Sequence, residues 1–202
     1  MRWLMYYNVK RSLDFFISLI GILITCPVLL LVSIFILVDS RGPIIFKQKR
    51  LGKNGKEFNI YKFRSMTVGA ESKGSGQYSY SNDPRVTRVG KVIRATSIDE
   101  LPQFFNIIKG EMSLIGPRPT LTYHPKKITE YSDFEKKRFL VRPGVTGWAQ
   151  INGRKNVLWE DRFKFDVYYV ENLSFKFDCI ILITTIKNVI LMKDNLNINK
   201  TR

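Results

Sequence analysis

The segment that most constrains how this chain can fold is residues 15–38, a run of 24 residues without one charged side chain. At about 1.5 Å per residue, a straight helix of this length would reach about 36 Å, enough to cross the roughly 30 Å hydrocarbon core of a bilayer. The run is too long for the apolar part of a cleaved signal peptide, and no small-residue cleavage site follows it. The sequence therefore places this segment in a membrane.

Two features bear on whether the segment crosses that membrane. Pro27 lies at its midpoint, where a missing N–H and a clash with the carbonyl four residues earlier predict a kink. The positive-inside bias draws both ends towards the cytoplasm, because basic residues flank both. They are Arg2, Lys10 and Arg11 before the run and Arg41, Lys47, Lys49, Arg50, Lys53 and Lys56 after it. A re-entrant helix broken at Pro27 satisfies both ends, and a kinked single span is the alternative.

The charge balance points to an anionic partner. The chain has 33 Lys and Arg against 17 Asp and Glu, a formal net charge of +16. Such an excess suits nucleic acid, an anionic membrane surface or a phosphate-bearing substrate. No RNP-like motif or recognition-helix pattern is present, so we expect no nucleic-acid partner. A membrane-tethered basic protein that binds anionic lipid or nucleic acid, or a scaffold subunit, is the alternative to an enzyme.

Beyond the apolar run the chain has the mixed composition of a soluble domain. Residues 44–50 and 57–63 read as short strands on either side of a Gly-containing connection, which predicts an antiparallel hairpin. We expect two units: a membrane-anchoring helix over 1–40 and a single domain over 41–202. The fold class is α/β, more narrowly a helix-rich α+β domain with a small antiparallel sheet.

The helices of this domain are indicated by apolar spacing. Leucine, phenylalanine and isoleucine at positions 101, 104, 105 and 108 line one face of a helix that stops at Gly110, with Pro102 in its first turn. Residues 161–169 also predict a helix. The apolar stretch 179–192 suits a core helix or one lying at the membrane interface.

Asp99 and Glu100 are the best candidates for chemistry. Their predicted place at the start of a helix would stabilise negative charge through the dipole and the free N–H groups. An ionised aspartate can attack an electrophile, and attack on phosphorus would give an aspartyl-phosphate intermediate. Glu100 could bind Mg²⁺ or accept a proton. Acidic residues in a first turn are also ordinary helix caps, and that interpretation stays open.

Several cations next to turns could hold a phosphate substrate, because the planar fork of arginine suits phosphate oxygens in pairs. They include Lys62, Arg64, Arg94, Arg118 and Arg142. Each alone could be a solvated surface charge. The single histidine, His124, argues against a histidine-rich metal site or a Ser-His-Asp triad, and no Rossmann or P-loop motif occurs.

Ordered motifs along nearly the whole chain resemble those of one family. They are KRSLD at 10–14, the central Pro27, YKFRSM at 61–66, NDPRVTRVG at 82–90, SIDELPQ at 97–103, GEMSLIGPRP at 110–119, RPGVTGW at 142–148, and Asp166 with Tyr169. The chain resembles the bacterial sugar transferases that begin surface-glycan assembly, the monotopic phosphoglycosyl transferases. Ile98, where leucine is common, and Cys26, where a small polar residue often precedes the proline, are mild departures.

The resemblance implies a reaction and roles for named residues. Such enzymes move a sugar-1-phosphate from a UDP-sugar to undecaprenyl phosphate and release UMP. Asp99 would be the nucleophile and Glu100 its partner, with Mg²⁺ beside both. The implied substrate-binding residues are Lys62, Arg64, Arg94, Arg118, Arg142 and Asp166.

The resemblance also implies a place in the cell. It favours the re-entrant form of the membrane helix, with residues 41–202 as a catalytic domain on the cytoplasmic face of the bacterial inner membrane. Anionic lipids would be partners, and a homodimer is allowed. The chain lacks the extra membrane helices of larger members, so we expect a minimal catalytic unit that serves capsule, exopolysaccharide or related glycan synthesis.

Overall fold

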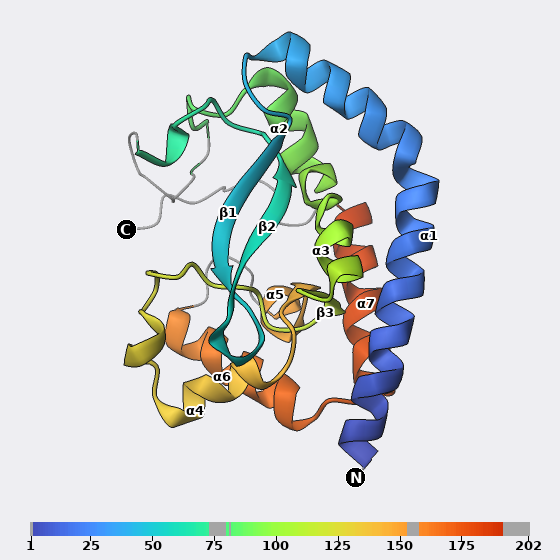
Figure 1. The fold of residues 1–202 in the computed structure, drawn as a ribbon, viewed down its shortest axis with the longest axis vertical. Coiled ribbons are helices and arrows are strands. Elements are labelled where there is room, and N and C mark those ends of the chain that lie inside the picture. Colours follow the sequence, from blue (N-terminus) through green and yellow to red (C-terminus); the bar gives the residue numbers. More distant parts are fainter. Residues whose placement is uncertain (1, 73–79, 81, 153–157, 192–202) are drawn as a thin grey trace.

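The computed structural model describes residues 2–72, 80, 82–152 and 158–191. A long helix leads into a hairpin, and short helices and a second strand pair follow (Figure 1). The α-helices and strands are α1 (Arg2–Asp39), β1 (Ile45–Leu51), β2 (Glu57–Phe63), α2 (Arg88–Ala95), α3 (Gln103–Lys109), β3 (Ser113–Ile115), α4 (Asp133–Lys136), β4 (Gly144–Thr146), α5 (Trp148–Ile151), α6 (Trp159–Glu171) and α7 (Phe175–Ile190). Short 3-10 turns connect several of them, among them Lys53–Gly55 and Ile98–Glu100. The helix-rich fold with a small sheet is confirmed.

Helix α1 contains the apolar run and corrects one detail of the prediction. The sequence predicts a helix broken at Pro27, whereas the helix continues through Pro27 as one element of 38 residues. It follows the side of the molecule and bends over its top instead of breaking (Figure 1). Within the described chain, Tyr6–Asp39 is the helical stretch long and apolar enough to cross a membrane.

Both ends of α1 pack against the same domain. Near its N-terminus Lys10 is buried and its Nζ lies 2.6 Å from Asp178 Oδ2 of α7. Near its C-terminus Val32 and Ile36 join a core cluster with Phe63 of β2. The two ends of the apolar helix are therefore anchored to one body.

The predicted hairpin is confirmed. Strands β1 and β2 pair antiparallel, with Ile45 opposite Phe63 and Leu51 opposite Glu57. The connection turns sharply at Asn54 and Gly55, whose φ values of 56° and 72° lie in the left-handed region that asparagine and glycine tolerate. A second pair, β3 and β4, is parallel and was not expected from the sequence.

Helix α3 forms where the sequence predicts it but turns a different face inward. Gln103, Asn106 and Ile107 are buried, whereas Phe105 is 46% exposed. Asn106 faces inward because its side chain bonds backbone groups of β2, accepting from Tyr61 N at 2.9 Å and donating to the Asn59 carbonyl at 2.7 Å. Of the predicted apolar face, Phe105 therefore points away from the core, whereas Phe104 is partly buried against the cluster of Ile60, Ile107 and Met112.

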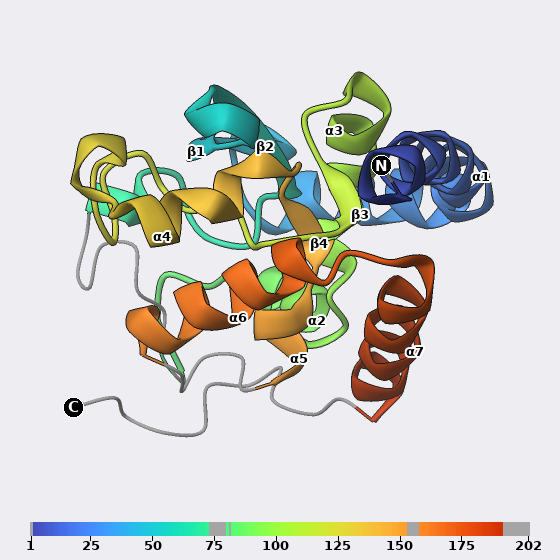
Figure 2. The ribbon, with the colours of Figure 1, turned by 90° about the horizontal axis from the view of Figure 1, so that it is seen from below.

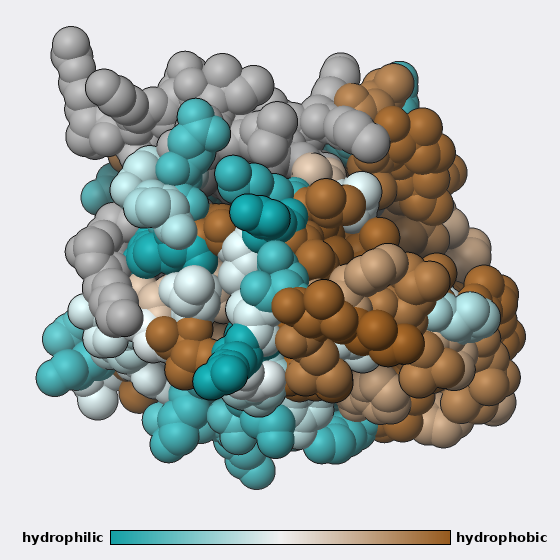
Figure 3. Space-filling view, turned by 90° about the horizontal axis from the view of Figure 1, so that it is seen from above, coloured by the Kyte–Doolittle hydropathy of each residue, from teal (hydrophilic) through white to brown (hydrophobic). Residues whose placement is uncertain are grey.

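An apolar surface is concentrated on one side of the molecule. Seen from below, α1 and α7 lie on this side and α3 lies against α1 (Figure 2). The space-filling view shows hydrophobic residues gathered there and hydrophilic ones on the opposite side (Figure 3). Large exposed apolar side chains recur along α1 and along α7, which begins at Phe175. This pattern suits contact with a membrane.

The attachment of α1 gives a first prediction. Asp178 is buried, pairs with Lys10, and accepts hydrogen bonds from the hydroxyls of Tyr6 and Tyr169. We expect Asp178→Asn to lower the free energy of unfolding by about 3 kcal/mol, because the buried Lys10 ammonium loses its 2.6 Å partner and keeps only Asp14, 3.9 Å away, as a counter-charge among the described residues. Denaturant unfolding in detergent measures this. The exposed pair Lys137–Glu171 is the control, since Glu171→Gln should cost less than about 1 kcal/mol. Equal losses in the two variants would contradict the prediction.

Candidate active site

Asp99 and Glu100 lie in the 3-10 turn Ile98–Glu100 that joins α2 to α3. Ser97 starts this turn with a φ of 59°, a left-handed conformation that reverses the chain after α2. The sequence places the pair in the first turn of α3, whereas α3 begins at Gln103, with Pro102 as its N-cap. Their negative charge is therefore balanced mainly by neighbouring cations and not by the helix dipole.

Glu100 is held by two of the predicted cations. Lys62 Nζ of β2 lies 2.6 Å from Glu100 Oε1, and Arg118 Nη2, from the segment after β3, lies 3.2 Å from the same oxygen. The Lys62 and Glu100 side chains are largely buried, whereas Arg118 is half-exposed. This arrangement unites three segments that are distant in the sequence.

The pKa values of the two carboxyl groups are shifted in opposite directions. Burial raises the pKa of Asp99 to about 6; the charge of Lys62 opposes this rise and that of Glu100 adds to it. Burial also acts to raise the pKa of Glu100, but Lys62 and Arg118 outweigh it and hold this pKa at about 2. Near neutral pH Glu100 is therefore ionised, and Asp99 lies close to its ionisation point. Such a divided pair is typical of sites that do acid–base or nucleophilic chemistry.

Arg94 completes the predicted cation group around Asp99. It lies in the last turn of α2, is partly buried, and its charge acts on the Asp99 carboxylate in the direction that favours ionisation. With Lys62 and Arg118 it makes the surroundings of the carboxylates positive. A phosphate group would be attracted to such a site.

The segment that carries Arg118 is fixed by two arginines that the sequence does not assign to the site. Arg138 Nη2 donates to the carbonyl of Arg118 at 2.7 Å, and Arg50 Nη1 donates to that of Pro119 at 3.2 Å. Asp166, predicted to bind substrate, is buried and pairs with Arg138 at 2.7 Å. Arg138 thus links Asp166 to the segment that carries Arg118. No spacing in the sequence signals this pairing.

Two other predicted substrate-binding arginines lie elsewhere. Arg64 is buried at the C-terminal end of α1, where Nη2 donates to the carbonyls of Ile36 at 3.2 Å and Ser40 at 2.6 Å. Arg142 donates to the carbonyl of Gly110 at 2.8 Å and to the hydroxyl of Tyr7 at 2.9 Å. The structure therefore brings Lys62, Arg94 and Arg118 together with the carboxylates but does not place Arg64 or Arg142 beside them.

The donor set suits a magnesium ion that is shared with substrate. Asp99 is half-buried, and its carboxylate has no hydrogen-bond or ion-pair partner among the described residues. In that part of the chain no group of three or more His, Cys, Asp and Glu side chains forms a closed metal site. Mg²⁺ commonly takes only one or two carboxylates and completes its shell with water and substrate phosphates. Asp99, with Glu100 beside it, fits this pattern.

The fold and the site together define a membrane-associated protein with a carboxylate pair set among cations, as phosphate chemistry requires. The sequence model of the bacterial sugar transferases matches residues 5–192, nearly the whole described chain. The protein belongs to this family.

Several relatives share extensive sequence with this chain. A UDP-N-acetylgalactosamine-undecaprenyl-phosphate N-acetylgalactosaminephosphotransferase of Aeromonas hydrophila is 43% identical over 188 residues, which cover 92% of this chain and 44% of that protein. A UDP-glucose:undecaprenyl-phosphate glucose-1-phosphate transferase of Escherichia coli is 40% identical over 183 residues, covering 88% and 39%. The uncharacterized sugar transferase EpsL of Bacillus subtilis is 40% identical over 183 residues, covering 91% and 88%. The chain thus spans less than half the length of the first two and most of the third.

Proposed function

We propose that this protein transfers a sugar-1-phosphate from a UDP-sugar to undecaprenyl phosphate at a membrane surface. The observation that carries the proposal is the half-buried carboxylate of Asp99, which has no hydrogen-bond or ion-pair partner among the described residues, beside the Lys62–Glu100–Arg118 cluster. The names of the relatives from Aeromonas hydrophila and Escherichia coli support the proposal, because each contains a UDP-sugar and undecaprenyl phosphate.

In the first half-reaction Asp99 is the nucleophile. A carboxylate oxygen attacks the phosphorus that carries the sugar and forms a P–O bond, while the bond from that phosphorus to the bridging oxygen breaks. UMP leaves with the bridging oxygen and its electron pair, and the phospho-sugar stays on Asp99. Lys62, Arg94 and Arg118 neutralise the diphosphate, and Glu100 holds Lys62 and Arg118 in place.

In the second half-reaction undecaprenyl phosphate is the acceptor. One of its phosphate oxygens attacks the same phosphorus, the bond to Asp99 breaks, and the carboxylate is regenerated. The product is undecaprenyl-diphospho-sugar, and no water or further reactant is consumed. Two substrates that react in turn at one carboxylate predict ping-pong kinetics.

Asp99 and Glu100 are the residues that would hold Mg²⁺. When bound, the ion would neutralise charge on the diphosphate and on the leaving phosphate. Lys62, Arg94 and Arg118 would neutralise charge on the other phosphate oxygens. Binding of the UDP-sugar therefore depends on the metal ion and on these side chains.

The contacts of α1 support a re-entrant helix, and the basic residues at its two ends support a cytoplasmic site. Both ends pack on one domain, Lys10 against Asp178 and Ile36 against Phe63, so both belong on one side of the bilayer. The excess of Lys and Arg at both ends favours the cytoplasmic side. Anionic lipid headgroups would attract these Lys and Arg side chains, and we place the protein at the bacterial inner membrane.

The experiment that tests the proposal is UMP release by the detergent-purified chain with undecaprenyl phosphate and Mg²⁺. The donors are UDP-N-acetylgalactosamine, UDP-glucose and UDP-galactose, each supplied separately. We expect UMP and undecaprenyl-diphospho-sugar in equal amounts from at least one donor. Chelation of the metal should lower the rate by at least about a hundredfold, and added Mg²⁺ should restore it. Salt-sensitive binding of an oligonucleotide, with no UMP from any donor, would contradict the proposal and support the basic binding protein.

A further inference from the structure

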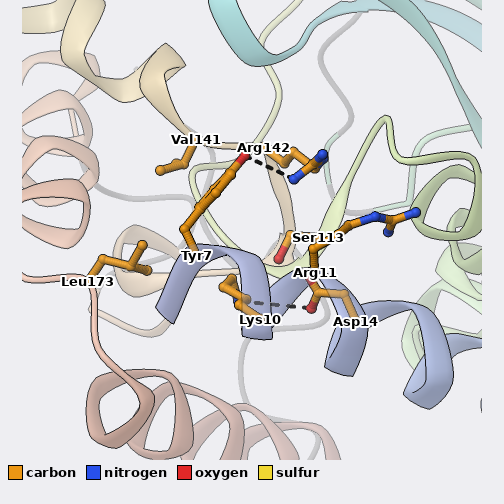
Figure 4. Close-up of a pocket in the computed structure, with 8 residues that line it drawn as sticks. All are labelled: Tyr7, Lys10, Arg11, Asp14, Ser113, Val141, Arg142 and Leu173. Carbon is orange, nitrogen blue, oxygen red and sulfur yellow. Dashed lines mark hydrogen bonds and ion pairs between the residues drawn. The ribbon is translucent and has the colours of Figure 1, made fainter. Parts of the chain in front are cut away.

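Two arginines from different segments hold the C-terminal end of α3. Arg11 of α1 donates from Nη1 to the carbonyl of Ile107 at 2.6 Å and from Nη2 to that of Ile108 at 2.9 Å. Arg142, which precedes β4, donates from Nε to the carbonyl of Gly110 at 2.8 Å. We call Arg11 and Arg142 the arginine clamp. Both side chains line the small pocket between α1 and β3 that Figure 4 shows.

The clamp matches what a helix end needs. The last carbonyls of a helix have no partner within the helix and carry its partial negative charge, so cations that donate hydrogen bonds stabilise them. The clamp holds three carbonyls at this end of α3, those of Ile107, Ile108 and Gly110, of which that of Ile107 also accepts from Gly110 N at 2.9 Å. Gly110 adopts a φ of 84°, and a Cβ added there would lie 3.5 Å from Arg11 Nη2, so the turn passes close to the arginine.

The clamp is itself fixed by its surroundings. Tyr7 of α1 accepts a hydrogen bond from Arg142 Nη1 at 2.9 Å, so both arginines depend on the same stretch of α1 (Figure 4). Asp14 accepts from Leu114 N at 3.2 Å and ties this stretch to β3. The N-terminal part of the membrane helix therefore sets the position of both guanidinium groups.

The other end of α3 leads directly to the carboxylates. Glu100 and Gln103 are separated by two residues, one of them Pro102, whose ring restricts the backbone. Asn106 also ties α3 to β2 through Tyr61 N and the Asn59 carbonyl, next to Lys62. A shift of α3 along its axis would therefore move Glu100 relative to Lys62.

We propose that Arg11 and Arg142 are positioning residues for this reaction: they couple the N-terminal part of the membrane helix to the catalytic turn by holding α3 in place. The proposal rests on the proposed function, and neither arginine contacts substrate in it. Displacements of about 1 Å from the reactive geometry can cost about a hundredfold in rate. The rate of turnover would thus depend on the position of the N-terminal part of α1 relative to α3.

The test measures the first half-reaction. Purified full-length chain is mixed rapidly with its active UDP-sugar and Mg²⁺ without acceptor, and UMP formation is followed over time. The rate reports positioning, and the amplitude reports the fraction of competent sites. We expect Arg11→Met and Arg142→Met to lower the rate by about tenfold to a hundredfold, with full amplitude and a KM for UDP-sugar within about twofold. Arg11→Lys, which keeps the charge, should restore part of the rate.

Arg41→Met is the matched control. Arg41 is exposed just beyond the other end of α1, and in the described part of the chain its side chain has no hydrogen-bond or ion-pair partner. We expect it to keep the wild-type rate. An Arg11→Met rate equal to wild type, a loss of amplitude alone, or an equal slowing by Arg41→Met would each overturn the clamp. A wild-type chain that releases no UMP would instead contradict the proposed function.

Discussion

Replacing Asp99 by Asn should lower UMP release by at least about a thousandfold while the fold is kept. The amide is nearly the same size as the carboxylate but is a far weaker nucleophile, so the P–O bond to the enzyme cannot form. The side chain is half-buried and has no hydrogen-bond partner among the described residues, so little packing is lost. Initial rates of UMP release, with the melting temperature measured in parallel, check both parts.

Asp133→Asn is the control for this change. Asp133 is fully exposed in α4, and its one described ion pair, with Lys136, is also on the surface. The same acid-to-amide exchange there should leave turnover unchanged. A trapped phospho-sugar found by mass spectrometry on the peptide with Asp99 would support the covalent step. Turnover of Asp99→Asn within tenfold of wild type would contradict it.

The hairpin and the closeness of the two carboxylates could be predicted because their signals are local. The strands over 45–51 and 57–63 follow from short apolar patterns around a Gly-containing turn. Asp99 and Glu100 are adjacent in the sequence, so their proximity needs no tertiary information. Such features depend on neighbours within a few residues, and the sequence contains all of them.

The inward face of α3 could not be predicted from apolar spacing. Spacing selects Phe105, but in the structure Asn106 is buried because it satisfies the backbone of β2. A helix can also carry apolar side chains on a face that contacts a membrane. Apolar spacing alone then does not show which face of the helix packs on the core.

The roles of the arginines could not be predicted either. Arg64, Arg118 and Arg142 all follow or precede turns, and nothing local separates them. In the structure Arg118 meets Glu100, whereas Arg64 and Arg142 bond carbonyls at the ends of α1 and α3. The N–H groups of arginine can bind phosphate oxygens or the carbonyls at a helix end. Only the tertiary contacts therefore show which role each arginine has.

The second large effect concerns Lys62 and pH. The donor's kcat/KM reports ionisations in the free enzyme, and Asp99 must be ionised to attack. Its pKa, raised by burial to about 6, predicts a rate that falls about tenfold per unit below pH 6 and levels off above about pH 7. The acceptor's kcat/KM is less suitable, because a phosphate monoester also titrates near pH 6.

Lys62→Met should move this acidic limb to higher pH. Lys62 is the cation that most lowers the pKa of Asp99, so its removal makes the carboxylate harder to ionise. Glu100 would lose its 2.6 Å partner and the donor a phosphate contact, so we expect a loss of at least about a hundredfold in kcat/KM at pH 7. Profiles from pH 5 to about 8.5 at fixed Mg²⁺ measure both effects.

Glu100→Gln provides the opposite shift. It removes the negative charge that raises the pKa of Asp99, so the acidic limb should move to lower pH even as the rate falls. Opposite displacements in the two variants would show that Asp99 is the group that titrates, because Lys62 and Glu100 act on it with opposite charge. A limb that stays in place in both variants, or moves the same way in both, would assign the ionisation to another group.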